Sequence, residues 1–215
     1  MEDLRLMSIN TDKVRSIIGD IAVVIEEQKQ YLSDLDQAIG DGDHGFNMAR
    51  GFGAVMQKLA DAPGADIGEV LKTVAMALIS NVGGASGPLY GTLFLKASGV
   101  AKGLTEIDLA GFIPVLKEGI LGVQARGKAE LGEKTMLDVL LPVLESLEKD
   151  KAAGLSGKEA FANAEKTAAD CMEKTKDIIA KKGRASYLGE RSIGHIDPGA
   201  TSSYMMISTI NKALA

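Results

Sequence analysis

The sequence predicts an all-α protein, an eight-helix antiparallel up-and-down bundle or barrel that forms a single domain over residues 1–215. Apolar residues recur at helical spacing in one segment after another, and no segment shows the apolar–polar alternation of a half-buried strand. Short polar or glycine-rich links join these segments, which is typical of antiparallel neighbouring helices. A chain of 215 residues with 46% hydrophobic content can bury one substantial core.

Eight helices are predicted from this periodicity. They cover, in order, residues 11–35, 44–59 and 67–81, a segment that starts after Ser86, a segment that carries Pro114 and runs towards Val123, residues 135–147, a segment that follows Ser156 and ends near Lys182 and Gly183, and a segment that starts at Pro198. The apolar face of the first helix illustrates the spacing, with Val14, Ile17, Ile18, Ile21, Ile25 and Leu32 on one side.

Capping signals and prolines support the boundaries. Thr105 with Asp108 resembles a capping box before the fifth helix, and Ser156 with Glu159 resembles another before the seventh. A proline lies in the first turn of the fourth helix, where it is tolerated. Pro142 lies inside the sixth helix, so we expect a kink or a later start there.

Up-and-down connectivity places every second link at the same end of the bundle. The links after the first, third, fifth and seventh helices then share one end, and they read DQAIGDGDHG, NVGGASGP, QARGKAELGEKT and KKGRASYLGERSIGHIDPG. The short polar links ADAPGAD, KGLTEID and KDKAAGLSG lie at the other end. The glycine-rich, charged and histidine-bearing links therefore meet on one rim with four helix N-termini, which attract phosphate. This arrangement predicts a nucleotide site at one end of the bundle.

An acidic loop on this rim predicts a metal site. Asp36, Asp41 and Asp43 lie within eight residues on a glycine-rich link. Two carboxylates about 4 Å apart repel each other by about 1 kcal/mol in bulk water, and by more in a partly dry cleft. Mg²⁺ prefers hard oxygen ligands and is commonly bound together with a phosphate. The loop is therefore expected to hold magnesium with a nucleotide.

Simpler interpretations remain open for single residues of this loop. Asp43 is a suitable N-cap for the following helix, and Asp41 with Gly42 is common turn chemistry. Asp36 is harder to explain in this way, because it lies near the C-terminal end of a helix, where the helix dipole disfavours a negative side chain. An EF-hand is excluded, because its D-x-D-x-D-G spacing is absent.

Two glycine motifs imitate known nucleotide-binding loops. Gly40, Gly42 and Gly45 spell G-x-G-x-x-G, but the preceding segment is predicted to be helical and the loop is acidic. Residues 122–129 match G-x-x-x-x-G-K, but Ala129 stands where a P-loop has Ser or Thr. Neither motif indicates a Rossmann fold or a P-loop.

Other rim residues are candidates for binding phosphate. Residues 83–87, GGASG, would let the backbone approach a phosphate closely, with the Ser86 hydroxyl as a further donor, although a plain helix–helix turn is the alternative. Arg184 and Arg191 offer paired donors, and either is also explained as a solvated charge. Both histidines of the chain, His44 and His195, lie on the rim.

Composition excludes several classes of function. A net charge of −5 and 4% aromatic residues argue against nucleic acid as a partner. Residues 73–95 carry no charge, but their SNVGGASGP centre predicts two buried helices and not a membrane span. The single Cys171 suits a reducing compartment, and residues 1–10 have no long apolar core of the kind found in a signal peptide. We therefore expect a cytoplasmic protein.

Four long motifs in order resemble one family. They read LDQAIGDGDHG, SNVGGASGPLYGT, ARGKAELGEKTMLD and KKGRASYLGERSIGHIDPGATS, and they resemble the nucleotide-binding L subunits (DhaL) of bacterial dihydroxyacetone kinases over essentially the whole chain. The resemblance implies an eight-helix barrel that holds ADP or ATP with two magnesium ions at one end. It implies that Asp36, Asp41 and Asp43 are the metal ligands. The implied ADP site consists of His44, Gly45, Phe46, Asn47, Ala85, Ser86, Gly127, Met136, Arg184, Asp197, Pro198 and Gly199.

The resemblance also implies partner subunits. In this family a separate K subunit holds dihydroxyacetone through a histidine, and 215 residues leave no room for that function here. Phosphate passes from an M-type phosphocarrier subunit to ADP on the L subunit and then to the ketose, whereas single-chain relatives use exchanging ATP. A chain of L-subunit size favours the first mode, and no residue is assigned as a catalytic acid or base.

Two alternatives remain open, and the second belongs to a different class of function. The first is an ATP-using subunit of a related kinase for another short ketose. The second is a nucleotide-loaded binding module that reports to a transcriptional regulator without turnover.

Overall fold

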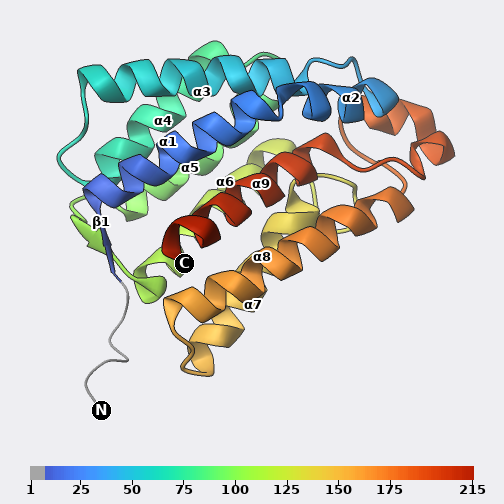
Figure 1. Ribbon diagram of the computed structural model, residues 1–215. Coiled ribbons are helices and arrows are strands. Elements are labelled where there is room, and N and C mark those ends of the chain that lie inside the picture. The colour runs from blue at the N-terminus through green and yellow to red at the C-terminus, as the bar shows by residue number, and fades with distance from the viewer. Residues whose placement is uncertain (1–7) are drawn as a thin grey trace.

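The computed structural model describes residues 8–215, which are all-α apart from one pair of two-residue strands (Figure 1). The α-helices are α1 (Thr11–Glu27), α2 (Lys29–Ile39), α3 (His44–Asp61), α4 (Ile67–Asn81), α5 (Ser86–Val100), α6 (Leu109–Gly127), α7 (Leu137–Ala152), α8 (Gly157–Lys174) and α9 (Pro198–Leu214). Two 3-10 segments, η1 (Thr175–Asp177) and η2 (Arg184–Ser192), precede α9. Strands β1 (Ile9–Asn10) and β2 (Glu106–Ile107) pair antiparallel. Residues 1–7, which carry most of the argument against a signal peptide, lie outside the described residues.

Neighbours in sequence are neighbours in space. From α3 onwards each helix packs against the next, α9 also packs against α1, and α1 and α2 both pack against α3 (Figure 1). Short links make these neighbours antiparallel. The predicted all-α antiparallel bundle is therefore confirmed.

The core is built from the apolar faces that the periodicity predicts. Ile17, Ile18, Ile21, Ile25 and Leu32 are all buried. The largest fully buried side chains come from several helices and include Phe52 of α3, Leu78 of α4, Tyr90 of α5, Ile120 of α6 and Leu147 of α7. Burial of these faces, at about 25 cal/mol per Å² of apolar surface, is the main stabilising term of the bundle.

One of the two predicted capping boxes is present in the structure. The predicted capping box of Ser156 and Glu159 is present, with both of its reciprocal hydrogen bonds. Asp108 caps α6 by accepting a bond from the backbone N–H of Gly111, at 2.8 Å. The predicted box of Thr105 and Asp108 is wrong, because Asp108 itself is the N-cap residue. Thr105 lies before the helix, and its carbonyl accepts bonds from Thr11. The sixth predicted helix starts late, at Leu137.

Three other expectations are wrong. The predicted first helix is divided at Gln28, whose φ of −98° and ψ of 6° bend the chain between α1 and α2. The predicted seventh helix ends at Lys174 and not near residue 182, because Thr175 is buried and its hydroxyl binds the carbonyl of Met172. The strand pair is too short to show an alternating pattern.

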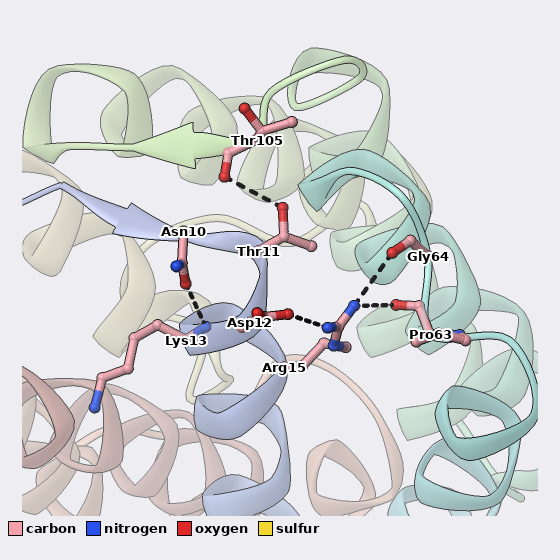
Figure 2. A network of polar contacts seen from close by, with 8 residues as sticks. All are labelled: Asn10, Thr11, Asp12, Lys13, Arg15, Pro63, Gly64 and Thr105. Carbon is pink, nitrogen blue, oxygen red and sulfur yellow. Dashed lines mark hydrogen bonds and ion pairs between the residues drawn. The ribbon is translucent and has the colours of Figure 1, made fainter.

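Polar contacts fix the start of α1 to two links at one end of the bundle (Figure 2). The Thr11 hydroxyl donates to the carbonyl of Thr105 at 3.2 Å. The Arg15 guanidinium donates to the carbonyls of Pro63 and Gly64, at 3.1 and 3.2 Å. Both links belong to the end of the bundle opposite the predicted nucleotide site.

None of the helices within residues 8–215 has both the length and the apolar character needed to cross a bilayer. The uncharged stretch of residues 73–95 is divided between α4 and α5, which pack against each other as expected.

Close packing of α4 on α5 generates a first prediction. A Cβ atom at Gly68 would lie 2.7 Å from the Cα of Lys102 and 2.8 Å from the carbonyl oxygen of Ser98, which are backbone atoms. Gly68→Ala should therefore lower the free energy of unfolding by about 1–3 kcal/mol. The control is Gly53→Ala in α3, where the added methyl group meets nothing within 4 Å. This change should raise the free energy of unfolding by about 0.5–1 kcal/mol. Urea unfolding of both variants measures the difference, and equal effects would contradict the packing argument.

Candidate functional site

The links that follow α2, α4, α6 and α8 surround one cavity of about 400 Å³. The first residue of each of four helices lines it, namely His44 of α3, Ser86 of α5, Leu137 of α7 and Pro198 of α9. No side chain caps the N-terminus of α5. Helix N-termini present N–H groups and a positive partial charge, so the cavity suits a phosphate-bearing ligand.

Most residues that the sequence singles out line this cavity. They are Asp36, Asp41, Asp43, His44, Ala85, Ser86, Gly127, Met136, Arg184, Asp197, Pro198 and Gly199. Three others lie elsewhere. Gly45 faces α2, where a Cβ atom would stand 1.9 Å from the carbonyl oxygen of Lys29; Phe46 is 47% exposed; and Asn47 is buried and accepts a bond from Arg50. Arg191 and His195 are exposed outside the lining.

The three aspartates form a compact cluster. One carboxylate oxygen from each of Asp36, Asp41 and Asp43 lies within 4.8 Å of the others. The Oδ2 atom of Asp36 accepts bonds from the backbone N–H groups of Asp43, at 2.9 Å, and His44, at 3.2 Å. Asp43 stands at the N-cap of α3 but makes no capping bond with its side chain, so its carboxylate is available to a ligand.

Two glycines make the acidic loop possible. Gly42 has a φ of +75°, which few other residues adopt without strain. A Cβ atom at Gly40 would lie 2.2 Å from the Oδ1 atom of Asp36. The loop therefore folds back over Asp36 only because neither position carries a side chain.

The chemistry of the cluster fits a hard cation. Burial raises the pKa of Asp36, backbone N–H groups of His44 and Asp43 oppose the rise, and the nearby Asp41 and Asp43 add to it. Three carboxylate groups that repel one another offer the hard oxygen ligands that Mg²⁺ prefers, and a bound cation would remove the repulsion. The Arg184 guanidinium lies 2.9 Å from Asp41, so a cationic side chain already faces the cluster.

His44 is the start of a buried hydrogen-bond network that joins three helices. Its Nδ1 atom lies 2.9 Å from the Ser86 hydroxyl, and its Nε2 atom lies 3.0 Å from the Ser202 hydroxyl. Ser202 in turn lies 2.7 Å from the hydroxyl of Tyr90. Burial lowers the pKa of His44 to about 4, so the ring is neutral near pH 7. A neutral ring donates at one nitrogen and accepts at the other, which matches its two hydroxyl partners, Ser86 and Ser202.

Asp197 is held in place on both sides. Its backbone N–H donates to the Thr175 hydroxyl at 3.0 Å, and its carboxylate caps α9 by accepting a bond from Ala200 at 2.7 Å. Burial raises its pKa to about 7. The capping role that its position suggests is therefore present, and it does not prevent Asp197 from lining the cavity.

Sequence reasoning misses three buried residues at the cavity. Tyr90 and Lys134 line it, and Ser202 lies behind it in the hydrogen-bond network; Lys134 is also buried against the link before α9. The only signal for Ser202 is a run of small hydroxyl residues in an apolar helix, and Lys134 resembles an ordinary charge in a polar loop. Their roles depend on contacts with residues more than 40 positions away.

The low pKa of His44 generates a second prediction. Between pH 6.5 and 4 the unfolded chain binds a proton at this residue and the folded chain does not, so acid favours unfolding across that window. The wild type should lose about 3 kcal/mol more of its free energy of unfolding than His44→Gln between these pH values. Denaturant unfolding at several pH values measures this difference. The control His195→Gln replaces the exposed histidine and should behave as the wild type; parallel curves for all three proteins would contradict the assignment.

Comparisons with known proteins agree with this geometry. Residues 38–212 match the DAK2 domain family. The chain is 46% identical over 200 residues to the "PEP-dependent dihydroxyacetone kinase 1, ADP-binding subunit DhaL" of Listeria innocua, covering 93% of this chain and 95% of that protein. It is 43% identical over 207 residues to the "PEP-dependent dihydroxyacetone kinase, ADP-binding subunit DhaL" of Escherichia coli K12, covering 96% of this chain and 99% of that protein.

The fold also matches a solved structure. The dihydroxyacetone kinase of C. freundii, in complex with AMP-PNP and Mg²⁺, superposes with a TM-score of 0.74 at 22% identity. The match covers 99% of this chain and 36% of that one, so the chain spans about a third of the solved kinase. The matched residues and the near-complete coverage of both bacterial relatives show that this chain belongs to the DAK2 domain family.

Proposed function

We propose that this chain is the ADP-binding subunit of a PEP-dependent dihydroxyacetone kinase. Two relatives that carry this description are 43% and 46% identical to it over nearly their whole length. The observation that carries the proposal is the cluster of Asp36, Asp41 and Asp43 on the wall of a cavity that four helix N-termini also line. Acidic oxygens for a cation beside free N–H groups for phosphate are the two requirements of a Mg–nucleotide site.

Each wall of the cavity has a proposed role. Asp36, Asp41 and Asp43 would hold Mg²⁺, as two ions, and bound Mg²⁺ would neutralise the phosphate oxygens of ADP. The uncapped N-terminus of α5, with Ser86, would bind phosphate. The remaining proposed ADP-site residues on the wall are His44, Ala85, Gly127, Met136, Arg184, Asp197, Pro198 and Gly199. Gly45, Phe46 and Asn47 do not line the cavity and are proposed from the family resemblance alone.

Phosphoryl transfer in such a site depends on positioning and on charge. The guanidinium of Arg184 faces the acidic cluster and offers paired N–H donors, so it can stabilise negative charge on a transferring phosphoryl group. His44 is neutral and fixed between two hydroxyl groups, so its function is to hold Ser86 and not to carry phosphate. Enclosure by four links favours ADP that stays bound and is rephosphorylated in place.

The remaining features of the proposal concern assembly. We expect the helices to form one eight-membered barrel in a single domain, with α1 and α2 together as one bent member, and the nucleotide at the end that carries the cavity. The partners would be a K subunit that holds dihydroxyacetone and an M-type phosphocarrier subunit, all in the cytoplasm. The word subunit in the names of the relatives supports an enzyme of more than one chain.

A third prediction tests the metal ligands. Asp36→Asn, Asp41→Asn and Asp43→Asn should each weaken the binding of ADP in the presence of Mg²⁺ by at least about tenfold, because each removes a charged ligand oxygen. Helix content by circular dichroism should not change. The matched control is Asp34→Asn. Asp34 is an exposed aspartate on α2, the helix that carries Asp36, and its side chain contacts Gln30. Wild-type affinity in all three variants, measured by calorimetry, would contradict the metal assignment.

A fourth prediction tests the division into subunits. The isolated chain should form no dihydroxyacetone phosphate from dihydroxyacetone and ATP, and transfer should appear when a K-type subunit is added. Transfer from phosphoenolpyruvate should require the phosphocarrier proteins as well. Rapid turnover by the isolated chain, measured by coupled assay of the product, would overturn the proposal.

A further inference from the structure

Lys134 is a buried lysine at the wall of the candidate cavity. Its side chain is among the largest that are fully buried, with 1% relative exposure. Its ammonium group donates to the backbone carbonyls of Thr175, at 2.6 Å, Ile178, at 3.3 Å, and His195. An ammonium group has three N–H bonds, and this arrangement uses all of them. Buried lysines are rare, and this one is compensated by carbonyl groups.

The backbone of Lys134 is also unusual. Its φ is +63°, in the left-handed region that residues other than glycine seldom adopt. Within residues 8–215 the only other non-glycine residue with a positive φ is Lys128. Such a conformation persists only where the surroundings fix it, and it is concentrated at functional sites.

The three carbonyl groups belong to one segment, residues 175–197, which joins α8 to α9. It contains no α-helix, and η2 is interrupted at Gly189, whose φ is 57° and ψ is −127°. Two further contacts of this segment are made with Glu133, the neighbour of Lys134. The backbone N–H of Lys181 donates to the carbonyl of Glu133 at 3.1 Å, and the ammonium of Lys182 lies 3.5 Å from the Glu133 carboxylate.

This segment carries two residues of the candidate site. Arg184 begins η2, and its side chain is 69% exposed and paired with Asp41. Asp197 ends the segment and caps α9. Because little of the Arg184 side chain is packed, the position of its guanidinium depends on where the backbone of residues 175–197 is held.

We propose that Lys134 is a positioning residue that fastens residues 175–197 to the link before α7 and so places Arg184 at the acidic cluster. The choice of Mg–ADP as the ligand rests on the proposed function. The attachment of residues 175–197 to Lys134 rests on the three hydrogen bonds of its ammonium group. A purely structural lysine would affect stability alone. If Lys134 positions Arg184, then Arg184 contributes to nucleotide binding only while Lys134 is present.

The first experiment measures the fastening without any ligand. Lys134→Met removes the ammonium and leaves three carbonyls without their donor. Hydrogen exchange should then accelerate by about tenfold or more in residues 175–197, with α1 to α5 unchanged. The control is Lys128→Met, the other lysine with a positive φ, which is exposed and outside the cavity lining. It should leave exchange in this segment unchanged. No acceleration in Lys134→Met, or the same acceleration in Lys128→Met, would overturn the proposal.

The second experiment measures the coupling to Arg184. Affinity for ADP with Mg²⁺ is determined by calorimetry for the wild type, Lys134→Met, Arg184→Ala and the double variant. Arg184→Ala should weaken binding by at least about tenfold in the wild type, because it removes a charge-assisted contact. In the Lys134→Met background the same change should have less than a third of that effect. Additive effects would overturn the positioning role.

The two experiments separate this inference from the proposed function. A wild-type chain without affinity for Mg–ADP would contradict the proposed function, while the exchange experiment still decides whether Lys134 holds the segment. If Lys134→Met does not fold, Lys134→Gln retains two N–H donors and should show a smaller acceleration in the same residues. Absence of that local acceleration would overturn the proposal.

Discussion

The carboxylate of Asp36 is the interaction on which the acidic loop depends. It lies in the last turn of α2 and accepts bonds from the backbone N–H groups of Asp43 and His44, where α3 begins. One side chain therefore ends one helix, orients the next and fixes the loop between them. The same bonds oppose the rise in the pKa of Asp36 that burial causes, which favours a charged carboxylate. The geometry of the candidate metal site is in this way a consequence of how α2 and α3 are joined.

The opposite wall of the cavity is held by different means. The first half of the bundle is regular, and its links are short. The link between α8 and α9 is long and irregular, so few of its backbone groups can be satisfied by helical bonds. Some of these backbone groups bond instead to the buried side chains of Lys134, Thr175 and Ser192. A cavity wall without regular structure is thus fixed by buried polar side chains.

Sequence patterns predict the parts of this protein that local chemistry determines. Helical periodicity and caps such as Ser156 predict the bundle, and alternate connectivity predicts which links surround the cavity. The pattern fails at Gln28, where the helix bends, and after Lys174, where Thr175 bonds to Lys134 and Asp197. The acidic cluster is visible in the sequence because its three members lie close together in the chain. Lys134 and Ser202 are not, since their partners are remote and neither residue type indicates burial.

The distribution of charge in the cavity follows from burial. His44 and Asp197 are buried, and their pKa values move towards the neutral form, to about 4 and about 7. Asp41 and Arg184, in contrast, are at least a third exposed and form an ion pair with each other. A cation that binds at Asp41 must compete with Arg184 for the same carboxylate. An anion that accompanies the cation would give the guanidinium a new partner, so the two charges are best accommodated together. This physical constraint favours a ligand that brings a cation and a phosphate into the cavity as one unit over either ion alone.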